Sequence, residues 1–329
     1  MIILSLLSFF LSWAYLYFTA SVFVLGDDRY LKTSIPTPKF AQSTYIFLNR
    51  GKSLLQTSDY FRKRLANIEF LRDYSLKNRT ASFSLVIPTF ERYRCLNRSF
   101  YRIMQYRPPN TEIIVSDDSS KTEEKVKLLN EIADNYFTQD VYVIRHINNS
   151  GAFHTKLDGF LYAIGSHIMS LDDDDTFDPP FYIEMAQNID EKYDFIMPLH
   201  FGSLRWIRLP YHSLRQFISS YHNHVTFAFR RKLMEDVDYP FYDIPIIRDD
   251  CPLMVPLYIK TNMVNVKYYH NSGHYWVDDY FKEGHEGSKM AQKDKIRNGR
   301  TFLIEYATKI NRLDTIPYIK STYMENRLD

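Results

Sequence analysis

Residues 167–179 read HIMSLDDDDTFDP, a short apolar run that ends in four consecutive aspartates. The apolar run has the length and composition of a buried strand. Because side chains at i and i+2 of an extended segment point the same way, Asp172 and Asp174 are expected to converge on one cation. Asp173 and Asp175 are then expected to turn toward backbone or solvent. All-oxygen ligands of this kind favour Mg²⁺ or Mn²⁺.

The alternative for the aspartates is a polar turn that caps a helix beginning near Pro179. The preceding chain decides between the two, because short apolar runs alternate there with helix-like stretches. Strands are predicted over 83–87, 112–115, 141–144 and 168–171, and helices over 94–105, 121–133 and 151–164. This alternation indicates βαβ units and a parallel sheet, in which ligands bind at the carboxyl ends of the strands. The polar sequences PTFER, SDDSS, HINNSG and DDDD each follow one predicted strand, so we favour a ligand site.

Missing motifs narrow the kind of ligand. The sequence has no GxGxxG after the first strand, no GxxxxGK[ST], no GxSxG and no Cys/His set with zinc spacing. A net charge of +2 gives no field that would attract nucleic acid, and two cysteines make no disulfide framework. What remains is a nucleotide-diphosphate site neutralised by a metal on Asp172 and Asp174.

The first 26 residues predict a membrane anchor. Residues 2–26 carry no charge, and a helix of that length spans about 37 Å, enough to cross a hydrocarbon core of about 30 Å. An uncleaved signal anchor is preferred to a cleaved signal peptide because no basic residue precedes the run. The basic residues that follow favour a cytoplasmic domain. Asn-X-Ser/Thr sequons at Asn78, Asn97 and Asn148 permit a lumenal one instead.

Four regions are therefore predicted along the chain. Residues 1–26 form the transmembrane anchor, 27–80 a linker and stem, 81–275 the α/β domain, and 276–329 a helical C-terminal extension. Within the stem, apolar residues at helical spacing over 44–77 predict a helix that packs on the domain, with a simple spacer as the alternative.

Three segments in this order and spacing, SLVIPTFER, EIIVSDDSS and MSLDDDDTFDP, resemble the nucleotide-sugar half of GT-A-fold, family-2-like glycosyltransferases. The resemblance covers about residues 84–269. It implies a Rossmann-like, mixed but mostly parallel sheet flanked by helices. It also implies an inverting transfer from a nucleotide-diphosphate donor, most simply a UDP-sugar, to a hydroxyl of a glycan, lipid or protein acceptor. Lumenal enzymes of this kind are type II membrane proteins, so the domain is expected in the ER or Golgi lumen.

The resemblance assigns residues of the first two strands to the nucleotide. Pro88, Thr89 and Phe90 correspond to a segment that lines the base and ribose pocket, with Phe90 in place of the usual Tyr. Asp117 corresponds to the residue that accepts the uracil N3–H hydrogen bond. Its neighbour Asp118 is the better candidate for capping the next helix.

The resemblance also implies a diphosphate side and a metal site. The loop 148–151 is expected to offer exposed N–H groups to diphosphate. Lys156 falls where the family often has an arginine near the nucleotide, with a solvated helix lysine as the alternative. Asp172 and Asp174 are the implied ligands of Mn²⁺ or Mg²⁺, and Asp173 between them is grouped with the donor-binding residues. The four-Asp run leaves this register open by one residue.

In the second half, IIRDDCPLMV occupies the place of the family's Glu-Asp motif. Its second acid, Asp250, is the implied catalytic base, with Asp249 in the Glu position. A pair of helix caps before Pro252 is the alternative. His270 is the implied further metal ligand, with His274 close by in the sequence.

Two other functions stay open. A catalytically silent GT-A fold that binds sugar nucleotide or glycan is supported by the departures at Phe90, Glu91 and Asp249. A nucleotidyltransferase would need a Gly-rich loop after the first strand, and PTFERYRCL has no glycine. The absence of QxxRW argues against a processive synthase.

Overall fold

The computed structural model describes residues 52–74, 79–177, 179–187, 189–203, 206–208, 213–219, 227–246, 250–276 and 292–322. The predicted anchor over residues 1–26 and the acid Asp249 lie outside these ranges, so both stay predictions. Across the described ranges, we find no helix with the length and apolar character needed to span a membrane.

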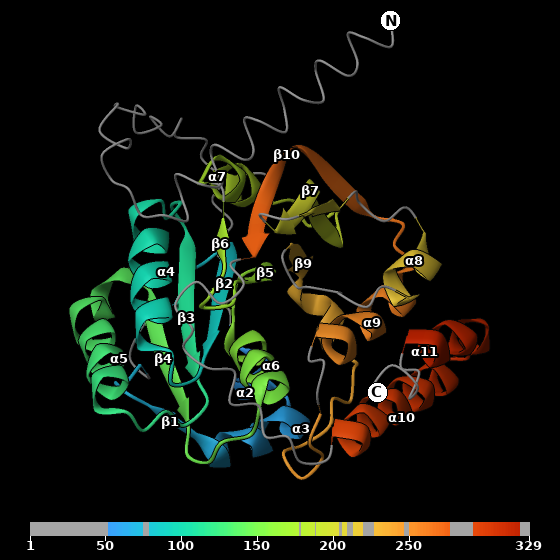
Figure 1. The fold of residues 1–329 in the computed structure, drawn as a ribbon, viewed down its shortest axis with the longest axis horizontal. Coiled ribbons are helices and arrows are strands. Elements are labelled where there is room, and N and C mark those ends of the chain that lie inside the picture. The colour runs from blue at the N-terminus through green and yellow to red at the C-terminus, as the bar shows by residue number, and fades with distance from the viewer. Residues whose placement is uncertain are drawn as a thin grey trace, which may run out of the picture.

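A mixed sheet runs through the centre of the molecule (Figure 1). Its strand order is β1-β4-β3-β2-β5-β9-β7-β10-β6, with β8 paired to β7. The strands are β1 Ile68–Phe70, β2 Phe83–Thr89, β3 Thr111–Asp117, β4 Val141–His146, β5 His167–Ser170, β6 Thr176–Phe177, β7 Phe195–Ser203, β8 Trp206–Arg208, β9 Ala228–Arg230 and β10 Val266–Trp276. Strands β4, β3, β2 and β5 are parallel, which confirms the predicted βαβ alternation. Their carboxyl ends therefore meet at one edge.

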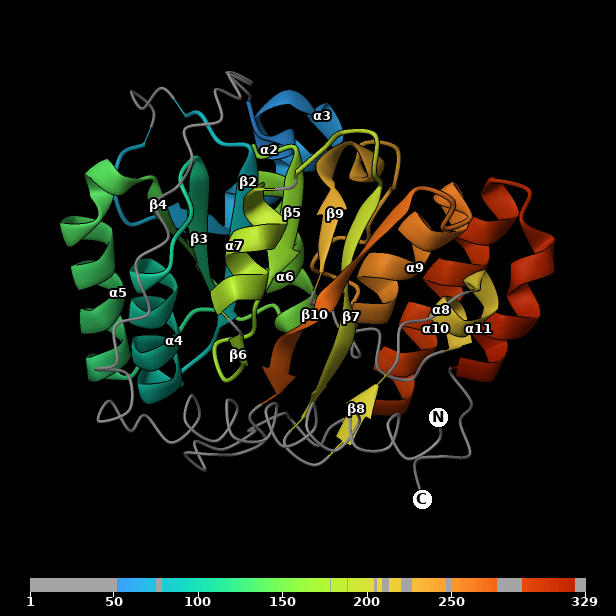
Figure 2. The ribbon, with the colours of Figure 1, turned by 90° about the horizontal axis from the view of Figure 1, so that it is seen from above.

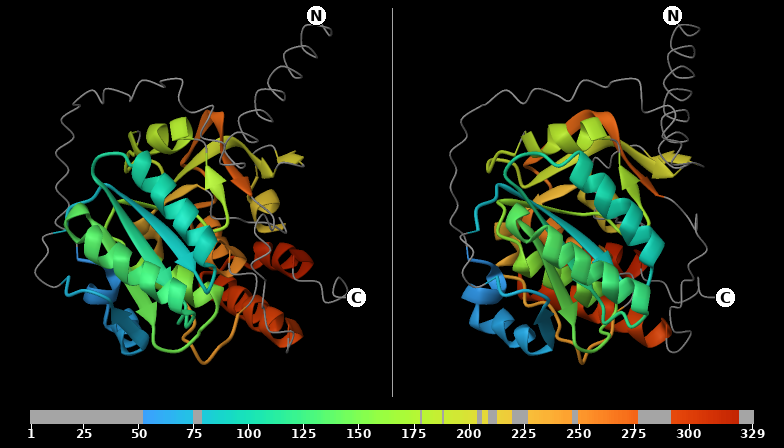
Figure 3. Two further views of the ribbon diagram at one scale, coloured as in Figure 1. Left: turned by 60° about the vertical axis from the view of Figure 1, so that its left-hand side comes forward. Right: turned by 90° about the vertical axis from the view of Figure 1, so that its left-hand side faces the viewer.

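Helices cover both faces of this sheet. They are α2 Leu54–Thr57, α3 Asp59–Arg62, α4 Tyr93–Gln105, α5 Glu123–Asn135, α6 Ala152–Tyr162, α7 Pro179–Gln187, α8 Leu214–Ser219, α9 Asp250–Thr261, α10 Gln292–Lys309 and α11 Ile316–Thr322, with short 3-10 helices η1 Lys63–Asn67, η2 Phe137–Gln139, η3 Arg231–Met234 and η4 Leu313–Thr315. Figure 2 shows α10 and α11 beside α9, at the opposite end of the sheet from α5. Figure 3 shows α4 and α5 packed side by side.

Two apolar cores follow from the alternation of side chains along the strands. On β2, Leu85 and Ile87 pack in the core that α4, α5 and α7 share. Val86, between them, points into the other core, with α2, α6, α9 and α10. Helix α6 approaches β2 closely at Gly159, where an added Cβ would lie 2.4 Å from a methyl carbon of Val86. A glycine is therefore required at this crossing.

The segment before the sheet belongs to the domain and is not one stem helix. Ser58 has extended backbone dihedrals that end α2, and its hydroxyl accepts a hydrogen bond from the N–H of Phe61, which begins α3. The chain then adds β1 antiparallel to β4. Leu55 and Phe61 are buried in the core shared with α6, so the predicted packing is present while the predicted single helix over 44–77 is wrong within the described part. The physical reason is the helix-capping serine in the middle of the apolar pattern.

Candidate active site

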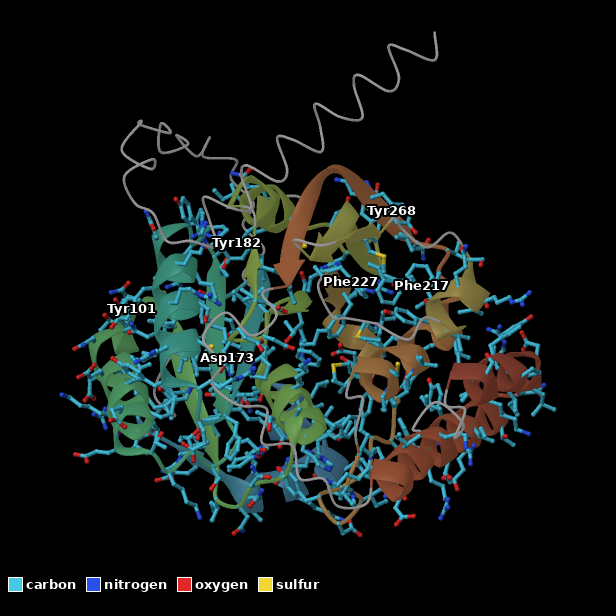
Figure 4. All side chains as sticks on the ribbon, in the orientation of Figure 1. Tyr101, Asp173, Tyr182, Phe217, Phe227 and Tyr268 are labelled. Atoms are coloured by element: carbon cyan, nitrogen blue, oxygen red, sulfur yellow. The ribbon has the colours of Figure 1, made fainter. Side chains whose placement is uncertain are left out.

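The candidate residues gather at the carboxyl edge of the parallel strands. Thr89 and Asp117 end β2 and β3 and are paired in register. The aspartate run directly follows β5, and Asp250 is the first residue of α9. Asp173, labelled in Figure 4, lies within this group. The predicted coincidence of polar segments at one sheet edge is thus confirmed for the residues that the structure describes.

The aspartates form a turn and not an extended segment. The N–H of Asp175 donates to the carbonyl of Asp172 over 3.0 Å, which brings these two residues together. Asp172, Asp174 and Asp175 each offer one carboxylate oxygen, and the three oxygens lie within 4.8 Å of one another. The expected convergence of Asp172 and Asp174 is present. The expectation that Asp175 turns away was wrong, because a turn brings i and i+3 side by side.

Asp173 points inward, away from that cluster. It is fully buried, accepts a hydrogen bond from the hydroxyl of Thr89, and pairs with Arg92 at 2.5 Å. The ammonium of Lys125 lies 3.9 Å away and also contacts the Thr89 hydroxyl. Burial raises the pKa of Asp173 to about 6, against the opposing effect of the two cations. Asp173 is therefore a supporting residue and not an outward-facing ligand.

Arg92, just before α4, and Arg98, within it, hold the turn in place. Arg92 pairs with the carboxylate of Asp174 as well as with Asp173, and Arg98 donates to the backbone carbonyl of Asp174 over 2.9 Å. Burial acts to lower the pKa of Arg92, but the neighbouring carboxylates raise it above its ordinary value. Sequence reasoning missed Arg92 and Lys125. For Arg92, the density of basic residues in ERYRCLNR after the first strand is the signal that was available.

Lys156 joins the two halves of the site. Its ammonium lies 3.0 Å from a carboxylate oxygen of Asp172 and 2.8 Å from one of Asp250. The Lys156 side chain is only 5% exposed, so the alternative of a solvated helix lysine is wrong. The candidate metal ligand and the candidate base, which are far apart in the sequence, are thus neighbours through one cation.

The two acids at the carboxyl end of β3 are held by different groups of the protein. Asp117 is buried and accepts hydrogen bonds from the backbone N–H and hydroxyl of Ser120, and burial raises its pKa. Asp118 does not cap the next helix. It accepts the N–H groups of Ser150 at 2.7 Å and Gly151 at 2.8 Å. These two N–H groups are therefore bound within the protein, and the prediction that they are exposed to a ligand was wrong.

The end of β2 leads into an irregular turn. Pro88 and Thr89 are buried, whereas Phe90 is 36% exposed and so offers a ring face to solvent. Glu91 has a positive φ of 57° and its carboxylate accepts hydrogen bonds from the N–H groups of Lys121 and Thr122. Glu91 therefore holds in place the two residues that immediately precede α5.

The histidines lie on β10, whose side chains in this stretch are outside the described residues. The backbone of His274 is in register with Phe177, two residues beyond Asp175, while Tyr269, next to His270, is in register with Pro198. The register favours His274 over His270 as the histidine nearer the aspartates. His270 as a metal ligand stays a prediction.

The chemistry of this edge fits a divalent cation. Three carboxylates within one short span are hard oxygen ligands, which Mg²⁺ and Mn²⁺ prefer. Arg92 pairs with Asp174 and Lys156 with Asp172, and a divalent cation would further lower the repulsion among the three carboxylates.

Comparisons with known proteins agree with this geometry. Residues 84–243 match the sequence model of glycosyl transferase family 2. Among solved structures, S. aureus TarS is similar with a TM-score of 0.55 and 18% identity, over 75% of this chain and 44% of that chain. Its segment 1-349 gives a TM-score of 0.55 and 18% identity, over 74% and 73% of the two chains.

The same TarS segment in complex with UDP-GlcNAc gives a TM-score of 0.54 and 17% identity, over 73% of this chain and 72% of that one. At such identities the likeness concerns the fold, and this chain spans less than half the length of the first TarS structure. Among curated proteins, no sequence matches the chain. Taken with the family match, the sheet and the aspartate turn identify residues 84–243 as a GT-A-fold, family-2-like glycosyltransferase domain.

Proposed function

We propose that this chain transfers a sugar from a UDP-sugar to a hydroxyl of a glycan, lipid or protein acceptor, with inversion at the anomeric carbon. The observation that carries the proposal is the Lys156 bridge, which joins the aspartate turn to Asp250 at one sheet edge. The choice of UDP is supported by the neighbour TarS 1-349, which was solved with UDP-GlcNAc.

On the donor side, Asp172, Asp174 and Asp175 would hold Mn²⁺ or Mg²⁺. A divalent cation bound there supplies charge stabilisation to a diphosphate leaving group. The protein's own contribution is a turn that Arg92 and Arg98 fix before any ligand binds. Such preorganisation avoids a reorganisation cost during the reaction.

For the nucleotide, the exposed ring of Phe90 would stack on the base, and Pro88, Thr89 and Asp117 would line the pocket beside it. Asp117 would accept the uracil N3–H while keeping its contacts to Ser120, because each carboxylate oxygen has two acceptor sites.

On the acceptor side, Asp250 would take the proton of the attacking hydroxyl while the bond from the anomeric carbon to the diphosphate oxygen breaks. Its oxygen lies 2.8 Å from the Lys156 ammonium. When donor diphosphate draws that ammonium toward itself, Asp250 becomes available to the acceptor. The acceptor oxygen thus becomes bonded to the anomeric carbon, its proton stays on Asp250, and the nucleotide leaves as UDP.

Measuring UDP release from a panel of UDP-sugars with Mn²⁺ tests the proposal. Turnover that needs both metal and acceptor supports it. UDP-sugar binding without any turnover, across a broad acceptor panel, would favour the catalytically silent fold instead.

We further propose a type II membrane protein with its domain in the ER or Golgi lumen. The uncharged N-terminal run supports a membrane anchor, and the sequons permit a lumenal domain. The basic residues that follow the run favour a cytoplasmic domain instead. Protease digestion of sealed microsomes separates the two orientations, since a domain degraded without detergent would be cytoplasmic.

A further inference from the structure

A second group of buried charges lies behind the candidate site. It comprises Arg64, Asp158, His146 and Asp118, none of them more than 5% exposed. Arg64 pairs with Asp158, the other oxygen of Asp158 lies 2.8 Å from Nε2 of His146, and Nδ1 of His146 lies 2.9 Å from Asp118. Two cations and two carboxylates thus alternate in one chain, and we call it the Arg64 chain.

The Arg64 end of this chain is fixed from several directions. Its guanidinium donates to the carbonyl of Pro240 over 2.9 Å and to Nδ1 of His154 over 2.9 Å. It also lies over the ring of Tyr242, 4.4 Å from the centroid. The hydroxyl of Tyr242 donates to Asp158 over 2.6 Å. An arginine held by its full fork of donors cannot be replaced by lysine without losing contacts.

The other end of the chain holds the entry to α6. Asp118 accepts the N–H groups of Ser150 and Gly151, immediately before that helix begins. Within α6, His154 and Asp158 are one turn apart and both contact Arg64. Lys156 lies between them in sequence and reaches the opposite way, to the aspartate turn and Asp250. The Arg64 chain therefore fixes the helix that presents Lys156.

We propose that Arg64 is a positioning residue for the donor site, acting through the Arg64 chain on α6 and so on Lys156. The inference rests on the proposed function. It makes the segment 52–74, which precedes the family match, part of the functional domain. Arg64 touches no reacting group itself, so its effect must appear in the geometry of α6 and in nucleotide affinity.

Arg79 provides a matched control. It is also buried, also precedes the family match, and pairs with the buried Glu112 at 2.6 Å. Its guanidinium lies over the ring of Tyr162 at 4.1 Å, and it donates to the Tyr162 carbonyl. Glu112 lies at the amino end of β3, away from the candidate site. Arg64→Lys and Arg79→Lys each remove a guanidinium that packs on a tyrosine ring. Only Arg64→Lys is expected to loosen the start of α6.

The experiment compares Arg64→Lys with Arg79→Lys in the full chain. Amide hydrogen exchange over residues 148–156, at the start of α6, and UDP affinity with Mn²⁺, by titration calorimetry, are measured for both variants. This window leaves out the end of α6, where Arg79 donates to the Tyr162 carbonyl. We expect Arg64→Lys to speed exchange there and to weaken UDP binding by about tenfold, at the lower end of the roughly 10- to 100-fold cost of losing a residue that orients a ligating group. Arg79→Lys should leave both readouts near wild type. Equal effects of the two variants would overturn the inference.

Two further outcomes keep the test decisive. If Arg64→Lys fails to fold, Tyr242→Phe takes its place, because it removes only the hydroxyl on Asp158 and should raise exchange in the same residues. If the wild type binds no UDP, the proposed function fails. The exchange data then decide whether Arg64 positions α6, and unchanged exchange in Arg64→Lys, or in Tyr242→Phe where that variant replaces it, contradicts the inference.

Discussion

Asp250 is either the catalytic base or a helix cap, and one substitution distinguishes the two roles. Asn caps a helix about as well as Asp but cannot accept a proton. We expect Asp250→Asn to lower the transfer rate by about 10²–10⁴-fold, with UDP affinity retained. The control is Asp236→Asn, which removes an exposed carboxylate paired with Lys260 and should change neither quantity. Full transfer by Asp250→Asn would move the base elsewhere, with Asp249 tested next.

The aspartate turn makes a second prediction at the scale of single residues. Asp175→Asn removes one oxygen ligand of the candidate metal cluster and should weaken Mn²⁺ binding on the order of tenfold, as seen by electron paramagnetic resonance titration. Asp173→Asn is the contrast. It should cost stability, because Arg92 and Lys125 lose their buried partner, while Mn²⁺ affinity stays close to wild type. If Asp173→Asn weakened Mn²⁺ binding and Asp175→Asn did not, Asp173 would be a metal ligand and the assignment of the ligands would have to be revised.

Why Asp172 and Asp174 were predictable and Asp175 was not is a matter of local geometry. Strand periodicity pairs i with i+2, and it holds only while the chain stays extended. Here the chain turns at the aspartates, because the N–H of Asp175 donates a hydrogen bond to the carbonyl of Asp172. From its own sequence, Lys156 was predictable only as a member of a helix, and only the family resemblance placed it near the nucleotide. Its partners come from the turn after β5 and from α9, and such a contact has no local signature in the sequence.

At the scale of elements, the strands and helices of the parallel half follow local patterns, so prediction was close. The helix predicted over 151–164 is observed as Ala152–Tyr162, and the strand predicted over 83–87 extends to Thr89. The last strand, β10, runs from Val266 to Trp276, beyond the end of the family resemblance at about residue 269. Pairing with β7 and β6 stabilises this length of β10, and the sequence of β10 alone does not predict either pairing.

The crossing of α6 over β2 gives a prediction for an element. Gly159→Ala would bring a methyl group to 2.4 Å from the Val86 side chain. The helix must shift, and overpacking of this kind typically costs about 1–3 kcal/mol. Urea unfolding measures that cost, and UDP affinity should fall with it because α6 carries Lys156. Adding Val86→Ala should restore part of the stability. No rescue in the double variant would show that the contact with Val86 is not the cause.

Across the whole molecule, the Arg64 chain ties the first described segment to the sheet and to α6. The sequence alone does not indicate this connection, because its four residues lie far apart along the polypeptide, at positions 64, 118, 146 and 158. Burying so many charges is costly unless each has a partner. The stability of the domain should therefore depend on the protonation of His146, which is the cation between the two carboxylates.

Burial alone would lower the pKa of His146, but its hydrogen bonds to Asp118 and Asp158 raise it to about 9, from an ordinary 6.5. The other groups facing it are Arg64, through Asp158, and the ring of Tyr242. Below pH 6.5 both the folded and unfolded chains hold the proton, so the stabilisation is complete. Between pH 6.5 and 9 only the folded chain holds it, so the free energy of unfolding must fall as the pH rises.

We expect that loss to approach roughly 3 kcal/mol by pH 9 to 10, the equivalent of the pKa change. Urea unfolding at pH 6, 8 and 9.5 measures it. The matched variant is His146→Gln, which keeps hydrogen-bonding groups but has no proton to release. Its overall stability is expected to be lower at pH 6, and its decline over the same range should be smaller than that of the wild type. Parallel declines in the two proteins would mean that other groups control the alkaline limit, and that His146 is not the cation joining Asp118 to Asp158.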